Sequence, residues 1–157
     1  MFFISNLFVT FFYIGRFPFA SGTLGSLVGV VLWYYLISIN FVFLILFFIL
    51  YFILSFILTN IYLKSSNNDD PSEVICDEII GQLIPLSIIS IADDTYLILI
   101  AFISFRIFDI FKFYPANKAE ELPGASGVIL DDVIAGIYSL IIVFISNHFL
   151  QLWLKTK

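Results

Sequence analysis

Long apolar segments alternate with short polar ones along this chain. The 40 residues from Leu24 to Leu63 contain no charged side chain. A helix needs about 20 apolar residues to cross the hydrocarbon of a bilayer. The segment therefore predicts two membrane helices, Leu24–Ile39 and Phe41–Leu63, with Asn40 as the turn between them.

The other apolar segments predict further helices. Ile79–Ala92 is short and contains Pro85, so we expect a kinked or partly re-entrant helix there. Thr95–Phe108 and Val133–Leu154 predict two more. Met1–Ile14 is apolar but has no basic start and no small-residue cleavage site, which argues against a cleaved signal peptide. We expect this segment to lie in the membrane interface or to enter the membrane partway.

Composition supports a membrane protein. The chain is 61% hydrophobic and 12% charged, with a mean hydropathy of +1.08. Soluble domains are about half apolar and about a quarter charged. We therefore predict an all-α, polytopic membrane helical bundle with four to six membrane-embedded helices, formed by residues 1–157 as one domain. The net charge of −5 argues against nucleic-acid binding.

Successive crossings place three polar segments, 15–23, 62–78 and 106–132, on the same side of the membrane. Asn40 and the pair Asp93-Asp94 fall on the other side, and we interpret the pair as a solvated turn.

Basic residues orient this arrangement. Five of the seven lie in the three polar segments, and the other two lie at the end of the chain. Cytoplasmic loops are enriched in lysine and arginine, so the three segments are predicted to face the cytoplasm. The five residues are Arg16, Lys64, Arg106, Lys112 and Lys118.

Five acidic residues cluster at predicted helix ends on that side: Asp77, Glu78, Asp109, Asp131 and Asp132. Ionisable groups close to hydrocarbon are costly and usually functional. Oxygen ligands in this number suit Mg²⁺ or a similar divalent ion. The alternative is that each carboxylate stabilises the start of a helix or stays in water.

Two cations accompany the acids. Arg106, Asp109 and Lys112 are spaced i, i+3 and i+6, which aligns them on one face of a helix. Such a row can bind a phosphate and a metal ion together. The alternative is a salt bridge within the helix.

A segment rich in glycine and small hydroxyl residues, Gly15–Ser26, opens the first long apolar segment. Free N–H groups at a helix start can bind an anion, so Gly22, Thr23 and Ser26 are candidate substrate-binding residues. The spacing matches no nucleotide-binding pattern. The alternative is a turn followed by close helix packing.

Other nucleophiles find little support. His148 is the only histidine, is predicted to lie at the far end of the last helix, and is interpreted as structural. Cys76 is interpreted as a small apolar filler, because two neighbouring carboxylates disfavour a thiolate.

Taken in order, four segments resemble the motifs of the phosphatidylglycerophosphatase A family. They are Pro18–Ser26, Asp77–Gly81, Phe105–Lys112 and Gly127–Gly136. The resemblance covers essentially the whole chain. It implies an all-helical enzyme of the bacterial inner membrane that removes, with Mg²⁺, the terminal phosphate of phosphatidylglycerophosphate to give phosphatidylglycerol.

The chain departs from the family pattern in its loops. Ser21 replaces a proline of the first motif, and Phe113 follows Lys112 where the family usually has proline. Gly124-Ala125-Ser126-Gly127 stands where the family usually has a pair of glycines. These differences affect loop conformation and remove no charged group.

The sequence thus predicts metal-assisted hydrolysis of a phosphomonoester. The five acids would hold one or two Mg²⁺ ions and orient water; Arg106, Lys112 and the segment around Thr23 would bind substrate. Two alternatives stay open. One is a small membrane protein without enzymatic activity, such as a cation transporter subunit. The other is a phosphatase for a different phospholipid monoester.

Overall fold

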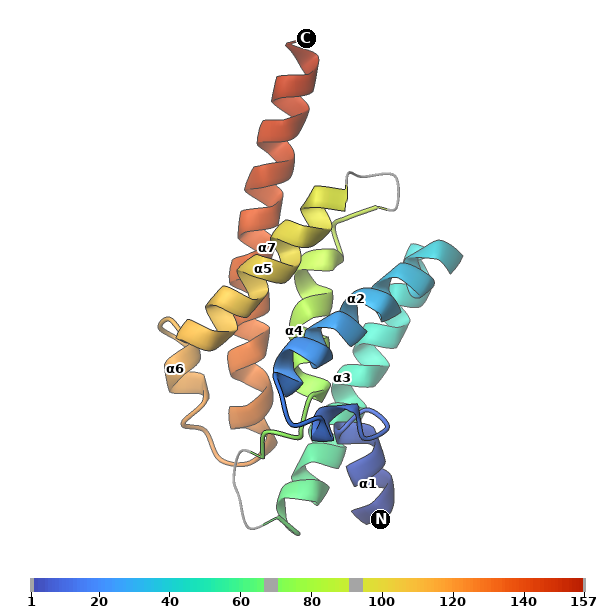
Figure 1. The fold of residues 1–157 in the computed structure, drawn as a ribbon, viewed down its shortest axis with the longest axis vertical. Coiled ribbons are helices and arrows are strands. Elements are labelled where there is room, and N and C mark those ends of the chain that lie inside the picture. Colours follow the sequence, from blue (N-terminus) through green and yellow to red (C-terminus); the bar gives the residue numbers. More distant parts are fainter. Residues whose placement is uncertain (1, 67–70, 91–94, 157) are drawn as a thin grey trace.

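The protein folds as a bundle of helices (Figure 1). The computed structural model describes residues 2–66, 71–90 and 95–156, and no strand occurs in these ranges. The predicted turn at Asp93-Asp94 lies outside them. The elements are α1 (Phe2–Val9), η1 (Ile14–Arg16), α2 (Ser21–Ile39), α3 (Phe41–Leu63), α4 (Cys76–Leu86), α5 (Thr95–Phe111), α6 (Ala116–Ala119) and α7 (Ala125–Lys155).

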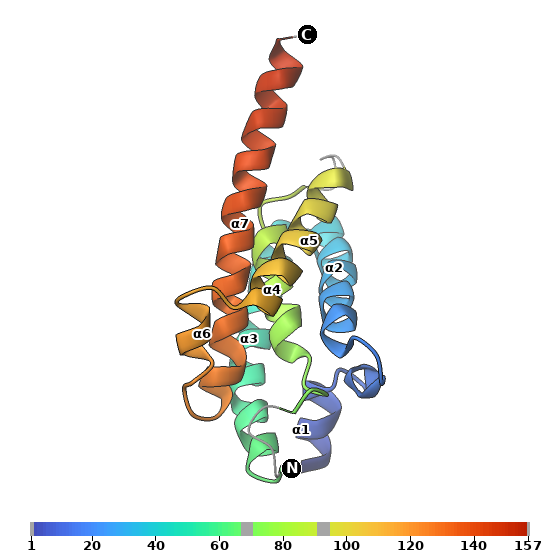
Figure 2. The same cartoon turned by 60° about the vertical axis from the view of Figure 1, so that its left-hand side comes forward.

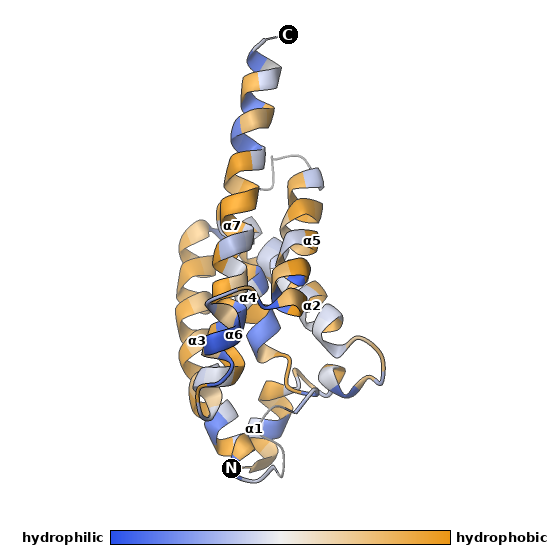
Figure 3. Cartoon of the chain, turned by 90° about the vertical axis from the view of Figure 1, so that its left-hand side faces the viewer, coloured by the Kyte–Doolittle hydropathy of each residue, from blue (hydrophilic) through white to orange (hydrophobic). Residues whose placement is uncertain are grey.

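Three of the described helices, α2, α3 and α7, are long and apolar enough to cross a membrane. Asn40 separates α2 from α3 as predicted, and its side chain accepts a hydrogen bond from the Val42 N–H at 3.0 Å. Such a bond satisfies one of the free donors at a helix start. Hydrophobic residues follow α3 along its length, while hydrophilic segments gather around α6 (Figure 3).

Helix α4 corrects the prediction for residues 79–92. It begins at Cys76 and ends at Leu86, so its 11 residues rise only about 16 Å, too little to cross a bilayer. Pro85 lies in the last turn of the helix. Proline has no N–H to donate to the carbonyl four residues earlier, here that of Gly81, and the helix stops one residue later.

Although short, α4 lies at the centre of the bundle (Figure 2), where it packs chiefly against α7 and α2. Glycines allow this closeness. A Cβ atom on Gly25 of α2 would lie 3.0 Å from Ile75 Cβ and 3.1 Å from Glu78 Cβ. On α7, a Cβ atom on Gly136 would lie 2.5 Å from the Gly81 carbonyl oxygen. The start of α4 thus packs closely against α2, and its middle packs closely against α7.

Helix α7 begins at Ala125, eight residues before the predicted start at Val133. Asp131 and Asp132 therefore lie on its second turn and not at its beginning. The Ala125 N–H donates a hydrogen bond to the Asn60 side chain of α3 at 3.1 Å. A residue of another helix thus caps the start of α7.

The direction of the helices agrees with the predicted topology. Helices α2, α4 and α7 begin, and α3 and α5 end, in the lower half of the molecule as drawn in Figure 1. The polar segments that were predicted to share one side of the membrane therefore gather at one end of the bundle. Helix α1, with eight residues, rises about 12 Å and is too short to span.

Candidate active site

One cavity of about 630 Å³ opens where α2, α4 and α7 begin and α5 ends, beside the loop that joins α6 to α7. It brings together residues from all three polar segments. Most of the candidate residues predicted from the sequence line it: Gly22, Asp77, Glu78, Arg106, Asp109, Lys112, Asp131 and Asp132.

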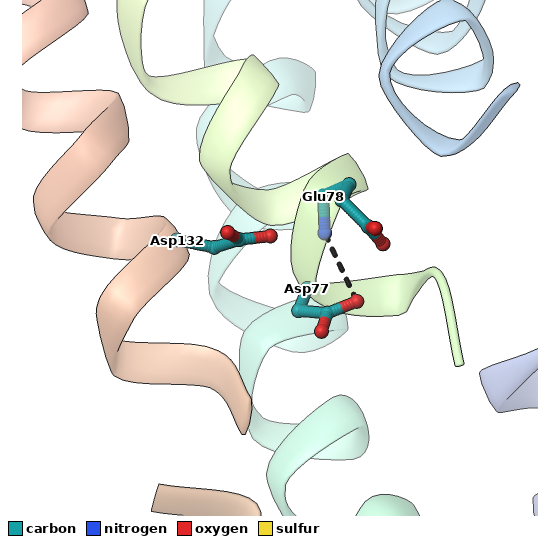
Figure 4. Close-up of side chains that lie close together, drawn as sticks. All are labelled: Asp77, Glu78 and Asp132. Atoms are coloured by element: carbon teal, nitrogen blue, oxygen red, sulfur yellow. Dashed lines mark hydrogen bonds between the residues drawn. The ribbon is translucent and has the colours of Figure 1, made fainter. Parts of the chain in front are cut away.

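The cavity contains a compact acidic cluster, formed by Asp77, Glu78 and Asp132. One carboxylate oxygen from each residue lies within 4.8 Å of the other two. Asp77 and Glu78 come from the first turn of α4, and Asp132 reaches across from α7 (Figure 4). Asp77 also accepts a hydrogen bond from the Glu78 N–H at 3.1 Å. Asp77 and Asp132 are buried and Glu78 is partly buried, and three carboxylates at this spacing repel one another unless a cation lies among them.

The hydrogen bonding of the cluster fits a divalent cation. Glu78 Oε2 and Asp132 Oδ2 are buried without a hydrogen-bond partner in the described part of the chain. Burial, together with the charge of Glu78, raises the pKa of Asp77 well above its usual value. Burial raises the pKa of Glu78 to about 7. Hard, oxygen-rich ligand sets of this kind bind Mg²⁺ or Ca²⁺, so these three residues could hold a metal ion.

The other two predicted acids lie beside the cluster, each paired with a cation. Asp109 Oδ2 lies 2.6 Å from Arg106 Nη1 within α5, so the salt bridge considered as an alternative is present. Asp131 Oδ2 lies 2.9 Å from Lys112 Nζ. Both cations line the same cavity as the acidic cluster.

Lys112 departs from the predicted row. It follows the last residue of α5 with a positive φ of 44°, so its side chain leaves the face that Arg106 and Asp109 share. It bridges Asp131 and Glu120, the latter at 2.6 Å. Burial lowers the pKa of Lys112, but its bonds to these two carboxylates outweigh that effect and the net shift is upward.

The start of α2 closes the cavity on the side of Arg106. A Cβ atom on Gly22 would lie 2.9 Å from Arg106 Nη2, so only glycine leaves room for the guanidinium. Ser26 Oγ accepts a bond from Arg106 Nη1 at 3.4 Å and donates to the Gly22 carbonyl at 3.0 Å. Thr23 lies on the same turn and is partly buried, but the cavity wall there is formed by Ser21 and Gly22.

Sequence reasoning missed Glu120, which completes the surroundings of Lys112. It lies in a polar loop, and no spacing rule links it to Lys112. Burial raises the pKa of the Cys76 thiol to about 11, as expected for an apolar filler. His148 lies 16 residues beyond Asp132 on α7, about 24 Å along the helix axis, and takes no part in the site.

The fold and the site define a helical membrane protein with a buried carboxylate cluster next to an arginine and a lysine. A family model confirms the resemblance seen in the motifs. The model for phosphatidylglycerophosphatase A matches residues 7–147. The chain belongs to this family, which is a family of phosphatases.

Individual relatives agree. A Bacteroides thetaiotaomicron protein named "Putative phosphatidylinositol-3-phosphatase" is 36% identical over 92% of this chain and 94% of its own length. The phosphatidylglycerophosphatase A of Haemophilus influenzae is 34% identical over 83% of this chain and 81% of its own length. The Escherichia coli enzyme of the same name is 28% identical over 85% and 78%. No solved structure matches the chain.

Proposed function

We propose that this protein hydrolyses the terminal phosphomonoester of phosphatidylglycerophosphate, giving phosphatidylglycerol and inorganic phosphate, at the cytoplasmic face of a bacterial inner membrane. One observation carries the proposal: Asp77, Glu78 and Asp132 converge in the same cavity as Arg106 and Lys112. A metal-compatible cluster beside two cations suits a substrate whose reacting group is a dianionic phosphate.

In this proposal the acidic cluster holds Mg²⁺, which supplies charge neutralisation at the phosphate and activation of water. Arg106 donates to phosphate oxygens, and its buried Nε has no hydrogen-bond partner among the described residues. Lys112 binds a second phosphate oxygen. Asp109 orients Arg106 through the 2.6 Å ion pair. The acyl chains stay in the bilayer while the head group enters the cavity.

Asp131 is our candidate for the general base. Its Oδ2 is held by Lys112 at 2.9 Å, while its Oδ1 is buried without a partner in the described structure. That oxygen can accept the proton that the attacking water loses.

A second substrate deserves a direct comparison, because the B. thetaiotaomicron relative is named for an inositol phospholipid and matches nearly the full chain. Both substrates carry a phosphomonoester on a phospholipid head group, so the same cluster can serve either. The two substrates would differ in the head group that carries the phosphate, while the hydrolysis of the phosphomonoester would be the same.

The cation-transporter alternative is less well supported. Transport sites lie near the bilayer midplane. Asp132 lies seven residues after the first residue of α7, about 10 Å from that end of a helix about 46 Å long.

Phosphate release by purified, detergent-solubilised protein tests the proposal. We expect release from phosphatidylglycerophosphate with Mg²⁺, none with EDTA, and a loss of at least about 100-fold in the Asp131→Asn variant. Glu121→Gln is the matched control, because Glu121 lines the same cavity but is exposed and paired with Lys118. Faster release from phosphatidylinositol 3-phosphate would favour the second substrate. Folded protein that releases phosphate from neither lipid would refute the proposal.

A further inference from the structure

A second cavity, of about 470 Å³, adjoins the first. The two share part of their walls, formed by Ala20, Ser21 and Ser72. The lining of the second cavity adds two charged residues, Arg16 and Glu73. None of the individual candidate residues predicted from the sequence lines this second cavity.

The Arg16 side chain is held in place at this cavity. Its Nη2 donates to Asn6 Oδ1 of α1 at 3.0 Å, and its guanidinium lies 4.9 Å from the centre of the Tyr13 ring. Arginine offers five N–H donors in a planar fork that matches phosphate. Asn6 occupies one of them, and the Tyr62 hydroxyl lies close to the guanidinium.

The surroundings of Arg16 match the depth of a lipid head group. Phe17 and Phe19, on either side of Pro18, are 57% and 75% exposed. Aromatic side chains are enriched where a membrane meets water. An anion bound by Arg16 would therefore lie close to the acyl chains of the lipid that carries it.

The substrate class supplies such an anion. A phospholipid with a terminal phosphomonoester on its head group also has a phosphodiester, which joins that head group to the diacylglycerol. When the monoester occupies the first cavity, the phosphodiester lies nearer to the acyl chains, separated from the monoester by the length of the head group. A cationic side chain at that position would bind it. The second cavity adjoins the first through a shared wall and offers Arg16.

We propose that Arg16 binds the phosphodiester of the lipid whose phosphomonoester occupies the first cavity. This assignment rests on the proposed function and adds to it a residue that selects head groups with two phosphates. Arg16 touches no reacting atom, so it positions the substrate and takes no part in hydrolysis.

Glu73 provides a second test, because its negative charge should weaken the binding of an anion that Arg16 strengthens. Its carboxylate lines the same cavity and accepts a hydrogen bond from the Tyr62 hydroxyl at 2.7 Å. A carboxylate beside a bound phosphodiester repels it. An amide at this position keeps the acceptor for Tyr62 and removes the repulsion.

Steady-state kinetics on phosphatidylglycerophosphate test the proposal. For Arg16→Gln we expect KM to rise about 10-fold with kcat within about twofold. Arg16→Lys should recover part of the loss, and Glu73→Gln should lower KM. Inhibition by inorganic phosphate, which needs only the first cavity, should not change. The control is Lys64→Gln, which removes an exposed cation from the neighbouring polar segment and should leave KM unchanged.

Direct binding of short-chain phosphatidylglycerol, which has the diester but no monoester, makes the test independent of turnover. Arg16→Gln should weaken this binding about 10-fold. Unchanged binding would overturn the assignment whether or not the wild type is active. A fall in kcat, or a matching loss of inhibition by phosphate, would also overturn it, because either result would make Arg16 a structural residue. Wild-type protein that binds the diester through Arg16 but releases no phosphate would refute the proposed function alone.

Discussion

Asp132 shows at the scale of single residues how the site is built at the expense of stability. Its side chain comes from a helix apolar enough to cross a membrane, yet the residue is only 3% exposed and lies next to two other carboxylates. A buried charge without a partner costs several kcal/mol, or it takes up a proton. A carboxylate at this destabilising position is expected if its role is to bind a ligand.

Replacing Asp132 with Asn should therefore separate activity from stability. We expect Asp132→Asn to lose at least about 100-fold in kcat, because one ligand of the acidic cluster is gone. In EDTA we expect its Tm to rise by about 2–4 °C, because about 1 kcal/mol of repulsion is relieved. Phosphate release and thermal unfolding in the same detergent measure the two effects. A Tm below that of the wild type would show that the Asp132 carboxylate makes stabilising interactions in the fold that outweigh its repulsion by Asp77 and Glu78.

Glu78 predicts how metal binding should depend on pH. Its pKa is about 7 in the fold and about 4.3 in an unfolded chain, so the folded state binds the extra proton between these values. Without metal, ionisation of Glu78 should lower the free energy of unfolding as the pH rises from about 4.3 to about 7. Above this range, Glu78 should cause no further change.

Mg²⁺ binds the ionised carboxylate, so protons compete with it. The rise in Tm on adding Mg²⁺ should be larger at about pH 8 than at about pH 6. Melting curves with and without Mg²⁺ at both values measure it. An equal rise at the two values would mean that Glu78 does not bind the ion.

At the scale of elements, the two errors of prediction have different physical causes. Helix α4 ends at Leu86, one residue after Pro85. Because the missing N–H of a proline is a local property of the sequence, this end could have been predicted. The early start of α7 could not, because its cap comes from Asn60 on another helix. Gly124 precedes α7 with a positive φ of 66°. From the sequence alone, a glycine at this position is equally consistent with a helix start and with a continuing loop.

The cap on α7 can be tested by mutation. Asn60→Ala should lower the stability of the fold by about 1 kcal/mol, because the Ala125 N–H loses its acceptor. Asn60→Asp keeps an acceptor oxygen and adds a negative charge that a helix start favours, so it should retain wild-type stability. Thermal unfolding of the three proteins measures the difference. Equal losses in both variants would show that Asn60 acts through packing and not through its hydrogen bond.

For the whole molecule, the sequence predicted which segments meet but not how they pair. Runs without charge predict the long helices, and their alternation brings the polar segments to one end. The acids of α4 and α7 then share a site because both lie near that end. The partners of Lys112 escaped prediction because its positive φ directs it away from α5 and towards Asp131 and Glu120. The direction of the backbone after a helix depends on tertiary packing, which cannot be predicted from the neighbouring residues in the sequence.

The orientation in the membrane is a prediction from basic residues, and cysteine labelling can test it. Cys76 is fully buried, so the wild type should give little background. A membrane-impermeant maleimide applied to intact cells should label Thr156→Cys, just after the far end of α7, and not Ser65→Cys, two residues after the end of α3. Broken cells should label both. Labelling of Ser65→Cys from outside would reverse the orientation.

The split of the acidic cluster between α4 and α7 has a consequence for biosynthesis. A ribosome delivers the chain from its N-terminus, so Asp77 and Glu78 enter the membrane region well before Asp132 has been translated. Until α7 inserts against α4, the nascent protein has two of the three residues of its acidic cluster and no Lys112–Asp131 bridge. Insertion of α7 thus completes the site, and a chain stalled before α7 should be inserted but inert.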